Sequence, residues 1–445
     1  MVKKIDTALV SLWGQTVGAV SWLAEQGYAV FEYDTEFLNS NLDISPIHMS
    51  LEQARKGDAR FFFPHLNKHT FLGLPGLLAD ALPDKFGNSI IDTWLARQGR
   101  SGADFSPVER LCYTGKRAMG ALEFSPSIIK KYNKTVAVDV DELVNLAQEI
   151  MTQRSALNVN LGDTEKQHAD AIYDILRVGT SAGGARPKAV IAMDKKGHIL
   201  SGQADVPPGY DYWIIKFDGV NDLELGTPAG YGRIEYAYYQ MALAAGITMS
   251  ECRLLQENGR AHFMSKRFDR HNSQRGEGKV HMQSLCGIAH YDFNMAGAYS
   301  YEQAFMIMRK LRLTKAEAKQ QYRRMVFNVI ARNQDDHTKN IAYLMQNSQL
   351  QNKGQWSLSP AFDVTYSHNP AGQWTNQHQM SVNGKRDHFT RADLVTVGRS
   401  ISLSRPEKII DEVKESVRQW PKFAKIAQLN NKQMRGIQKF HRLDL

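Results

Sequence analysis

Hydrophobic and polar residues alternate in the first part of the chain and recur at helical spacing in the last part. Residues 8–20 place apolar positions on both sides of a Trp-Gly-Gln turn, which predicts a β-hairpin, and residues 28–33 predict another strand. Short apolar runs at 189–193 and 212–217 predict further strands. After about residue 300 the spacing becomes helical. We therefore expect a mixed first part and a mainly helical last part.

The same patterning divides the chain into three segments. Residues 1–125 form a predicted N-terminal subdomain, which closes with a loop and turn at 111–123. The stretch 126–136 is polar, basic and non-periodic, and it predicts a linker. Residues 138–262 predict a second segment of strands and helices, and residues 263–445 predict a third segment that is mainly helical.

Several single elements stand out within the second and third segments. Amphipathic spacing predicts helices at 139–154 and 233–245, and apolar runs predict strands at 263–268 and 341–345. The tail from residue 406 onward also has helical spacing. No internal repeat or low-complexity tract interrupts this order.

Composition narrows the class of protein. The 445 residues are 42% hydrophobic and 23% charged, which is ordinary for a globular protein with more than one domain. The sequence shows no signal peptide and no apolar run long enough to span a membrane, and its three cysteines are widely spaced. We expect a cytoplasmic protein that makes no membrane contact. The net charge of +9 favours polyanionic or acidic partners, or is a solvated basic surface.

The densest cluster of polar chemistry lies at 333–340. Four residues separate Asp335 from Asn340, and an isolated Asp363 follows a predicted strand. This is the order in which protein kinases supply the acceptor-orienting carboxylate and two Mg²⁺ ligands. In this reading His337 braces the loop, and Lys339 neutralises charge on the transferred phosphoryl group.

Two other readings of this cluster stay open. The run could be a polar loop that caps the preceding helix. Alternatively, Asp335, Asp336 and His337 could bind the metal of a hydrolase. Three consecutive ligands are geometrically awkward for one metal ion, so the kinase-like reading is favoured.

A glycine-rich run precedes the strand at 189–193. Gly183, Gly184 and Ala185 offer backbone amides to a polyphosphate, with Arg186 and Lys188 following as cations. The run is not a P-loop, because Lys and Ser/Thr do not follow the second glycine of the motif. A phosphate-covering loop of another kind and a flexible β-turn loop are the two readings.

Lys216 lies inside an otherwise apolar strand, where an unpaired charge is costly. In kinases a strand lysine binds the nucleotide phosphates and pairs with a helix glutamate. Glu235 lies in the first turns of the next predicted helix, where that partner belongs. The other reading is an edge-strand lysine that faces water.

The segment around Lys266 and Phe268 could be an inter-lobe hinge whose backbone binds the adenine edge of ATP. An ordinary strand with a polar end is the other reading.

Together these residues resemble the HipA family of toxin serine/threonine kinases, and the resemblance extends over nearly the whole chain. The motifs that carry it are Gly14-Gln15-x-Val17-Gly18, Leu77-x-x-x-Ala81-Leu82-Pro83-Asp84, Gly115 to Gly120, Ser181-x-Gly183-Gly184-Ala185-Arg186-Pro187-Lys188, Trp213-x-x-Lys216, Arg267-Phe268-Asp269-Arg270, Asp335-Asp336-His337-x-Lys339-Asn340 and Pro360-x-Phe362-Asp363.

The resemblance implies an α+β, protein-kinase-like bilobal fold: a small mixed N-lobe and a mainly helical C-lobe, preceded by an extra N-terminal α/β subdomain. It implies ATP and Mg²⁺ as cofactors and autophosphorylation at Ser181 or its neighbour Thr180. The implied substrate is a protein, such as an aminoacyl-tRNA synthetase, whose phosphorylation causes growth arrest and persistence. The implied partner is a HipB-like helix-turn-helix antitoxin, through which the chain would reach DNA indirectly.

Two other function classes stay open from the sequence. One is a kinase-like binding or repressor subunit that acts with a DNA-binding antitoxin and without catalysis. The other is a metal-dependent nuclease or phosphodiesterase. The complete set of Lys216, Asp335, Asn340 and Asp363 favours the active kinase, because pseudokinases usually lack at least one such residue.

Overall fold

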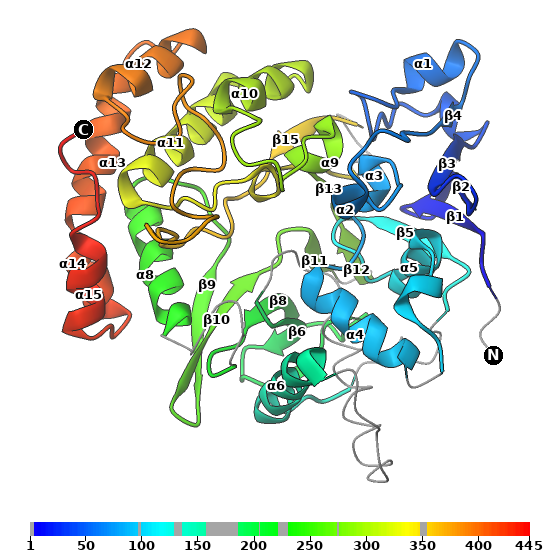
Figure 1. Cartoon of the computed structure of the whole chain (residues 1–445), viewed down its shortest axis with the longest axis horizontal. Helices are drawn as coiled ribbons and strands as arrows, with labels where there is room; N and C mark the ends of the chain where they lie inside the picture. The colour runs from blue at the N-terminus through cyan, green and yellow to red at the C-terminus, as the bar shows by residue number, and fades with distance from the viewer. Residues whose placement is uncertain are drawn as a thin grey trace.

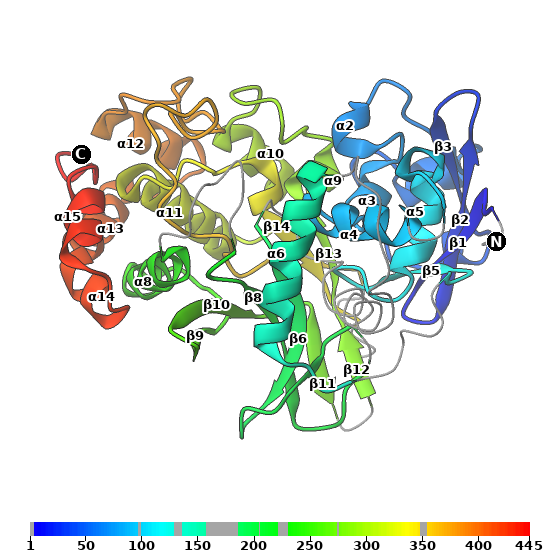
Figure 2. The ribbon, with the colours of Figure 1, turned by 60° about the horizontal axis from the view of Figure 1, so that its bottom comes forward.

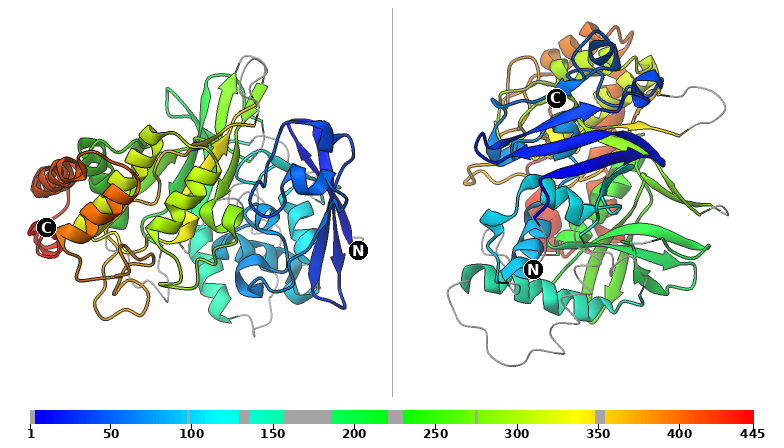
Figure 3. Two further views of the ribbon diagram at one scale, coloured as in Figure 1. Left: turned by 90° about the horizontal axis from the view of Figure 1, so that it is seen from above. Right: turned by 90° about the vertical axis from the view of Figure 1, so that its right-hand side faces the viewer.

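The computed structural model describes residues 4–96, 99–128, 136–156, 186–203, 205–220, 230–273, 276–347 and 354–445. The N-terminal strands lie at one end of the molecule and the C-terminal helices at the other, as Figures 1 and 3 show from two directions. No helix in these ranges is long and apolar enough to cross a membrane.

The N-terminal end is a five-stranded antiparallel sheet with the order β4-β3-β2-β1-β5. The strands are β1 (Thr7–Leu12), β2 (Gln15–Leu23), β3 (Tyr28–Tyr33), β4 (Arg60–Phe61) and β5 (Leu122–Ser125). Alternate side chains of β1 and β3 are buried, as the alternation of the sequence predicts. Trp13 and Gly14 make the β1–β2 turn with φ values of 51° and 81°. The predicted hairpin and the following strand are therefore confirmed.

Short helices connect and cover this sheet. They are η1 (Phe37–Asn39), α1 (Leu51–Arg55), α2 (Lys68–Phe71), α3 (Gly76–Ala79), α4 (Lys85–Ala96), η2 (Gly102–Asp104) and α5 (Pro107–Thr114). The predicted loop at 111–123 is wrong at both ends, because α5 continues to Thr114 and β5 begins at Leu122. A capping box between Ser106 and Glu109 starts α5, and the helix continues until Gly115 ends it.

A second five-stranded antiparallel sheet has the order β7-β6-β8-β10-β9. Its strands are β6 (Lys188–Asp194), β7 (Ile199–Ser201), β8 (Tyr210–Lys216), β9 (Cys252–Glu257) and β10 (Arg260–Lys266), and its helices are α6 (Val140–Ala156) and α8 (Tyr231–Ala244). Figure 2 shows α6 running across β6 and β8. The strands predicted at 189–193 and 212–217 and the helices predicted at 139–154 and 233–245 are confirmed.

The remaining part is mainly helical, with two small sheets. Its elements are β11 (Arg270–Ser273), β12 (Gly276–Lys279), β13 (His281–Ser284), α9 (Leu285–Ala289), α10 (Tyr301–Lys310), α11 (Lys315–Ala331), η4 (Thr338–Asn340), β14 (Ala342–Met345), β15 (Trp356–Leu358), α12 (Arg391–Ser400), α13 (Pro406–Arg418), α14 (Trp420–Ile426) and α15 (Asn431–Gln438). The strand predicted at 341–345 and the helical tail are confirmed. A small sheet with a helix on one side and a helical part on the other is the bilobal arrangement of a protein kinase.

Two large hydrophobic clusters hold these parts together. The first joins the N-terminal sheet to α3, α9, α11 and α13. The second joins α4 to α6, β6 and β8. Both clusters cross the segment boundaries predicted from the sequence, so the N-terminal segment packs against both of the segments that follow it.

Polar contacts reinforce the junction between the N-terminal segment and the second sheet. The fully buried Asp269 carboxylate accepts hydrogen bonds from Arg267 (2.7 Å), from Arg270 (2.8 Å) and from the backbone N–H of Gly120 (2.7 Å). Burial alone would raise the pKa of Asp269, but the two guanidinium groups outweigh burial and lower that pKa. The Arg267-Phe268-Asp269-Arg270 motif thus joins two segments of the chain.

We expect Asp269→Asn to destabilise the whole protein, because it leaves two buried guanidinium groups with one carboxylate fewer. The free energy of unfolding should fall by roughly 3 kcal/mol, as measured by urea unfolding at pH 7. Asp58→Asn is the matched control, because Asp58 lies exposed on the N-terminal segment. Equal unfolding midpoints for the two variants would contradict the role given to Asp269.

Candidate functional site

A cavity of about 1520 Å³ lies where the three parts of the chain meet. One wall is the start of α4 with the residues before it, and a second is formed by β6, β8 and β10. The third wall is formed by the segment after α11 and by residues 362–375. The cavity is larger than a typical small-molecule site of roughly 300–1,000 Å³. It therefore has room for a ligand and for part of a second reactant.

Lys216 is the centre of a partly buried ion cluster in this cavity. Its ammonium group lies 2.6 Å from Glu235 Oε1 on α8 and also pairs with Asp363. Burial alone would lower the pKa of Lys216, but Asp363 and Glu235 outweigh burial and raise it. The lysine is therefore held in its charged form. The water-facing reading of Lys216 is wrong, because the apolar strand β8 directs this side chain into the cavity and not outward.

Asp363 is held in an unusual backbone conformation. Its φ is +52°, in the left-handed region that Asp tolerates better than most residues. Just before it, the N–H of Ala361 donates to the carbonyl of Thr248 at 2.8 Å, which attaches this segment to the loop after α8. Burial alone would raise the pKa of Asp363, but Lys216 and then Lys188 outweigh burial and lower it. The carboxylate is therefore ionised and faces cations.

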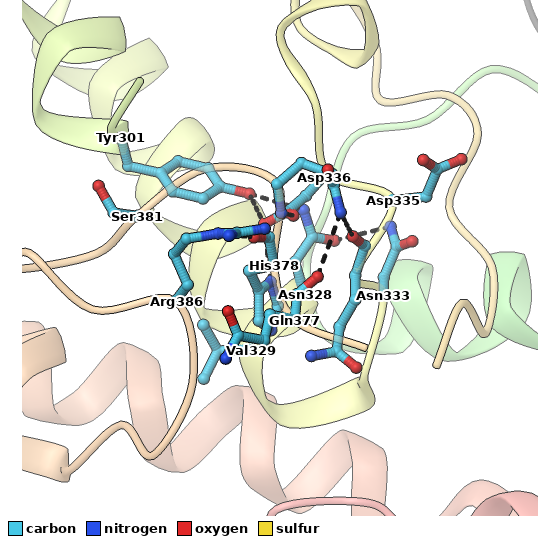
Figure 4. A network of polar contacts seen from close by, with 12 residues as sticks. Tyr301, Asn328, Val329, Asn333, Asp335, Asp336, Gln377, His378, Ser381 and Arg386 are labelled. Carbon is cyan, nitrogen blue, oxygen red and sulfur yellow. Dashed lines mark hydrogen bonds and ion pairs between the residues drawn. The ribbon is translucent and has the colours of Figure 1, made fainter. Parts of the chain in front are cut away.

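The run at 333–340 contains two adjacent carboxylates, Asp335 and Asp336, whose surroundings differ. Asp336 is buried and accepts hydrogen bonds from Tyr301 (2.9 Å), His378 (2.8 Å) and the backbone N–H of Gln379 (2.8 Å). Figure 4 shows Asp335 pointing away from this network. Asp336 thus anchors the loop, while Asp335 lines the cavity.

Asp335 is held by neighbours on both sides. The indole N–H of Trp374 donates to Asp335 Oδ1 at 2.6 Å, and His337 Nε2 lies 3.7 Å from the same oxygen. The side-chain amide of Asn340 donates to the backbone carbonyl of Asp335 at 2.8 Å. Asp335 is therefore fixed in orientation, and its side chain is still 40% exposed to the cavity.

Two further predicted residues of the run also line the cavity. The ring of His337 lies 5.3 Å from that of Phe293, and the Lys339 ammonium lies 5.1 Å from the centre of the same ring. The aromatic ring of Phe293 therefore contacts the side chains of both His337 and Lys339.

The glycine-rich segment is described only at its end. Ser181, Gly183, Gly184 and Ala185 lie outside the described residues. Arg186 lines the cavity with its guanidinium 3.9 Å from the centre of the Tyr231 ring at the start of α8.

Lys188, at the start of β6, pairs with the carboxylate of Asp84 at 3.2 Å. Asp84 comes from the N-terminal segment. Asp84 ends the Leu82-Pro83-Asp84 motif, and the sequence around it does not indicate a role in the site. The contact spans more than 100 positions of the chain, and no local pattern signals it.

The predicted hinge residues also line the cavity. Lys266, at the end of β10, pairs with Asp211 at 2.8 Å. The ring of Phe268 lies 5.7 Å from that of Phe362, directly before Asp363. Ile214, Met249 and Phe263 add apolar surface to the cavity, and the centre of the Phe263 ring lies 5.7 Å from the Lys216 ammonium.

Trp374 is the second residue that sequence reasoning missed. It lies in an irregular segment between β15 and α12, and no periodic pattern or motif marks it. Its importance depends on the tertiary contact with Asp335.

Arg442, near the C-terminus, stabilises the loop at 333–340 through His378. Arg442 Nη1 donates to His378 Nε2 at 3.2 Å, and His378 Nδ1 donates to Asp336. Arg442 also pairs with Asp387 and donates to the carbonyl of Val329 at 2.9 Å. A line of hydrogen bonds therefore runs from the last residues of the chain to the loop that carries Asp335.

We expect the stability contributed by Asp336 to depend on pH. Burial alone would raise the pKa of Asp336, but His378 and the donated hydrogen bonds outweigh burial and lower it. A lowered pKa stabilises the fold above the unfolded value of about 3.9, and this contribution is lost as pH falls through the folded value. Asp336→Asn should therefore cost roughly 3 kcal/mol in urea unfolding at pH 7, and less below about pH 4.

Asp335→Asn is the control for this experiment, because Asp335 is the neighbouring carboxylate and is partly exposed. It should leave the free energy of unfolding nearly unchanged at both pH values. A pH-independent cost for Asp336→Asn would refute the assignment of a buried, ionised anchor.

Comparisons with known proteins agree with this architecture. Residues 180–420 match the model of the HipA-like C-terminal domain, and residues 8–125 match that of the HipA N-terminal domain. No curated protein sequence matches the chain.

Two solved structures align with this chain, and the first of them is similar in fold. The Shewanella oneidensis MR-1 toxin antitoxin system, HipA with HipB and its operator DNA, aligns with a TM-score of 0.65 and 15% identity over 97% of this chain and 95% of that chain. The Helicobacter pylori proinflammatory kinase CtkA aligns with a TM-score of only 0.33 and 12% identity, over 53% of this chain and 86% of that chain. Because a family model covers more than half of its residues, this chain belongs to the HipA family.

Proposed function

We propose that this chain is a protein kinase that transfers the terminal phosphoryl group of ATP to a serine or threonine hydroxyl of a protein. One observation carries the proposal: a single cavity brings together Lys216, Glu235, Asp335, Asn340 and Asp363. These residues come from four separate stretches of the chain and correspond to the parts that phosphoryl transfer requires.

The phosphates of ATP would lie at the cationic end of this cavity. Lys216, oriented by Glu235, would bind the α- and β-phosphates. Arg186 and Lys188 add positive charge to the cavity, and they follow Gly183, Gly184 and Ala185 in the sequence, to which the family resemblance assigns phosphate contacts. The adenine would lie against the apolar lining residues near Phe268, with Lys266 beside the edge of the adenine ring.

The donor atoms here suit a magnesium ion. Asn340 and Asp363 offer an amide and an ionised carboxylate oxygen to one cavity, and Mg²⁺ prefers such oxygen ligands together with substrate phosphates. The amide nitrogen of Asn340 donates to the backbone, so its oxygen is directed elsewhere. When bound, the ion would neutralise charge on the phosphates.

Asp335 would orient the acceptor hydroxyl and accept its proton. The hydrogen bond from the indole N–H of Trp374 fixes one carboxylate oxygen of Asp335. The Asp335 side chain therefore need not reorganise when the acceptor hydroxyl binds. Lys339 would offset charge on the transferred group, and His337 would brace the loop.

The biological role extends the same proposal. The similar Shewanella protein is described with HipB and operator DNA. We infer a toxin of a toxin–antitoxin module, with a HipB-like antitoxin as partner and DNA reached through it. Phosphorylation of a translation protein, such as an aminoacyl-tRNA synthetase, and of Ser181 follow from the family resemblance.

The site geometry favours catalysis by phosphoryl transfer over metal-dependent hydrolysis. A hydrolase would need Asp335, Asp336 and His337 around one metal, yet Asp336 is turned away and engaged by three hydrogen-bond donors. In the described part of the chain, no three His, Cys, Asp or Glu side chains form a group that could hold a metal ion.

We expect the wild-type protein to gain phosphate when it is incubated with ATP and Mg²⁺, as measured by intact-protein mass spectrometry. Asp335→Asn should slow this gain by at least about 100-fold, because the acceptor loses its base. Lys216→Met should also weaken ATP binding, measured by calorimetry, because the phosphates lose their buried cation.

Lys56→Met and Asp58→Asn are the matched controls, since both residues are exposed on the N-terminal segment away from the cavity. Both variants should behave as wild type. A wild-type protein that binds Mg-ATP but gains no phosphate and modifies no candidate protein would refute the kinase and leave the binding-subunit function.

A further inference from the structure

The phosphate end of the cavity contains a carboxylate that belongs to the N-terminal segment. Asp84 and Lys188 pair at 3.2 Å, with only 4% and 3% of their side chains exposed. Lys188 lies directly opposite Lys216 in the register of β6 and β8. Asp84 therefore reaches the pair of strands that carries the central lysine of the site.

The position of Asp84 is fixed by its own backbone surroundings. Its Oδ1 accepts a hydrogen bond of 2.6 Å from the backbone N–H of Gly87 in the first turn of α4. The side chain of Asn88 donates to the carbonyl of Pro83 at 2.9 Å. Helix α4 in turn packs against α6, β6 and β8 in the second hydrophobic cluster. Asp84 thus cannot leave Lys188 unless the start of α4 also moves.

Lys188 and Lys216 share the cavity with the carboxylate of Asp363. Lys216 makes a direct ion pair with Asp363, and Lys188 lies opposite Lys216 in the register of β6 and β8. Removing one partner of a buried ion pair leaves the other charge poorly compensated. Without Asp84, Lys188 would lie beside a site whose anions include Asp363 and the phosphates of a bound nucleotide.

We propose that Asp84 is a positioning residue of the nucleotide site, which holds the Lys188 ammonium on the α4 side and leaves Asp363 to Lys216 and magnesium. The proposal rests on the proposed nucleotide binding, but not on phosphoryl transfer. The N-terminal segment is then a working part of the ATP site. Any partner that displaces the start of α4 would change the affinity for Mg-ATP.

A purely structural ion pair is the competing explanation, because removing one partner of a buried pair destabilises the fold whether or not the pair acts on a ligand. The two explanations differ in how Asp84 and Lys188 combine. A positioning residue acts through Lys188, so its effect on nucleotide binding vanishes once that lysine is gone. A structural pair affects folding stability and leaves nucleotide affinity unchanged.

The test is a double-mutant cycle on the full chain with Asp84→Asn, Lys188→Met and the double variant. Calorimetry measures the Kd for ATP with and without Mg²⁺, and thermal unfolding without nucleotide monitors stability. We expect Asp84→Asn to weaken Mg-ATP binding by about tenfold or more, the scale for groups that orient metal ligands. It should weaken Mg-free ATP binding much less.

In the Lys188→Met background, Asp84→Asn should change the Kd for Mg-ATP by less than about twofold, within the coupling error of such cycles. Asp84→Ser repeats the test with the N-cap hydrogen bond retained, in case the asparagine variant folds poorly. Asp141→Asn is the matched control, since Asp141 on α6 pairs with Arg260 on β10 and lies outside the cavity.

The proposal is overturned if Asp84→Asn and Asp84→Ser leave the Kd unchanged, or weaken binding equally with and without Lys188. It also falls, together with the proposed function, if the wild type binds no nucleotide. If the wild type binds Mg-ATP but transfers no phosphate, the kinase fails alone and the cycle still decides the role of Asp84.

Discussion

The partly buried ion cluster of Lys216, Glu235 and Asp363 is the interaction on which the site depends. It joins β8, α8 and the segment after β15, three elements that are distant in the sequence. An unpaired charge at this depth would be strongly unfavourable, so each partner constrains where the others lie. The same contact keeps the lysine charged and Asp363 ionised, which are the states that binding of phosphates and a divalent cation requires.

Near this ion cluster, the neighbouring carboxylates of Asp335 and Asp336 have different surroundings. The Asp336 carboxylate accepts hydrogen bonds from Tyr301, His378 and the backbone N–H of Gln379, and these bonds hold the loop in place. Its neighbour Asp335 then faces the cavity, held by Trp374. Asp336 is buried among hydrogen-bond donors and stabilises the loop, whereas Asp335 is partly exposed and lines the cavity.

The N-terminal segment forms part of the cavity wall. Its helix α4 shares a hydrophobic cluster with β6 and β8, and its sheet shares another with the helices of the C-terminal part. Across the same junction, Asp84 adds a buried ion pair with Lys188, and Asp269 accepts a hydrogen bond from the backbone N–H of Gly120. Such contacts bury surface that a separate domain would expose. The three predicted segments follow one another in the sequence, but in the structure they share hydrophobic clusters.

The sequence by itself determined the strands and helices with strong periodicity, the family, and which residue types belong to the site. Local spacing sufficed for these, as in the hairpin at 8–20 and in the five-residue step from Asp335 to Asn340. It failed at 111–123, where a capping box extended a helix into a predicted loop. Only the tertiary structure decided that Asp335 and not Asp336 faces the cavity, and that Trp374 and Asp84 join it, because these contacts connect residues far apart in the chain.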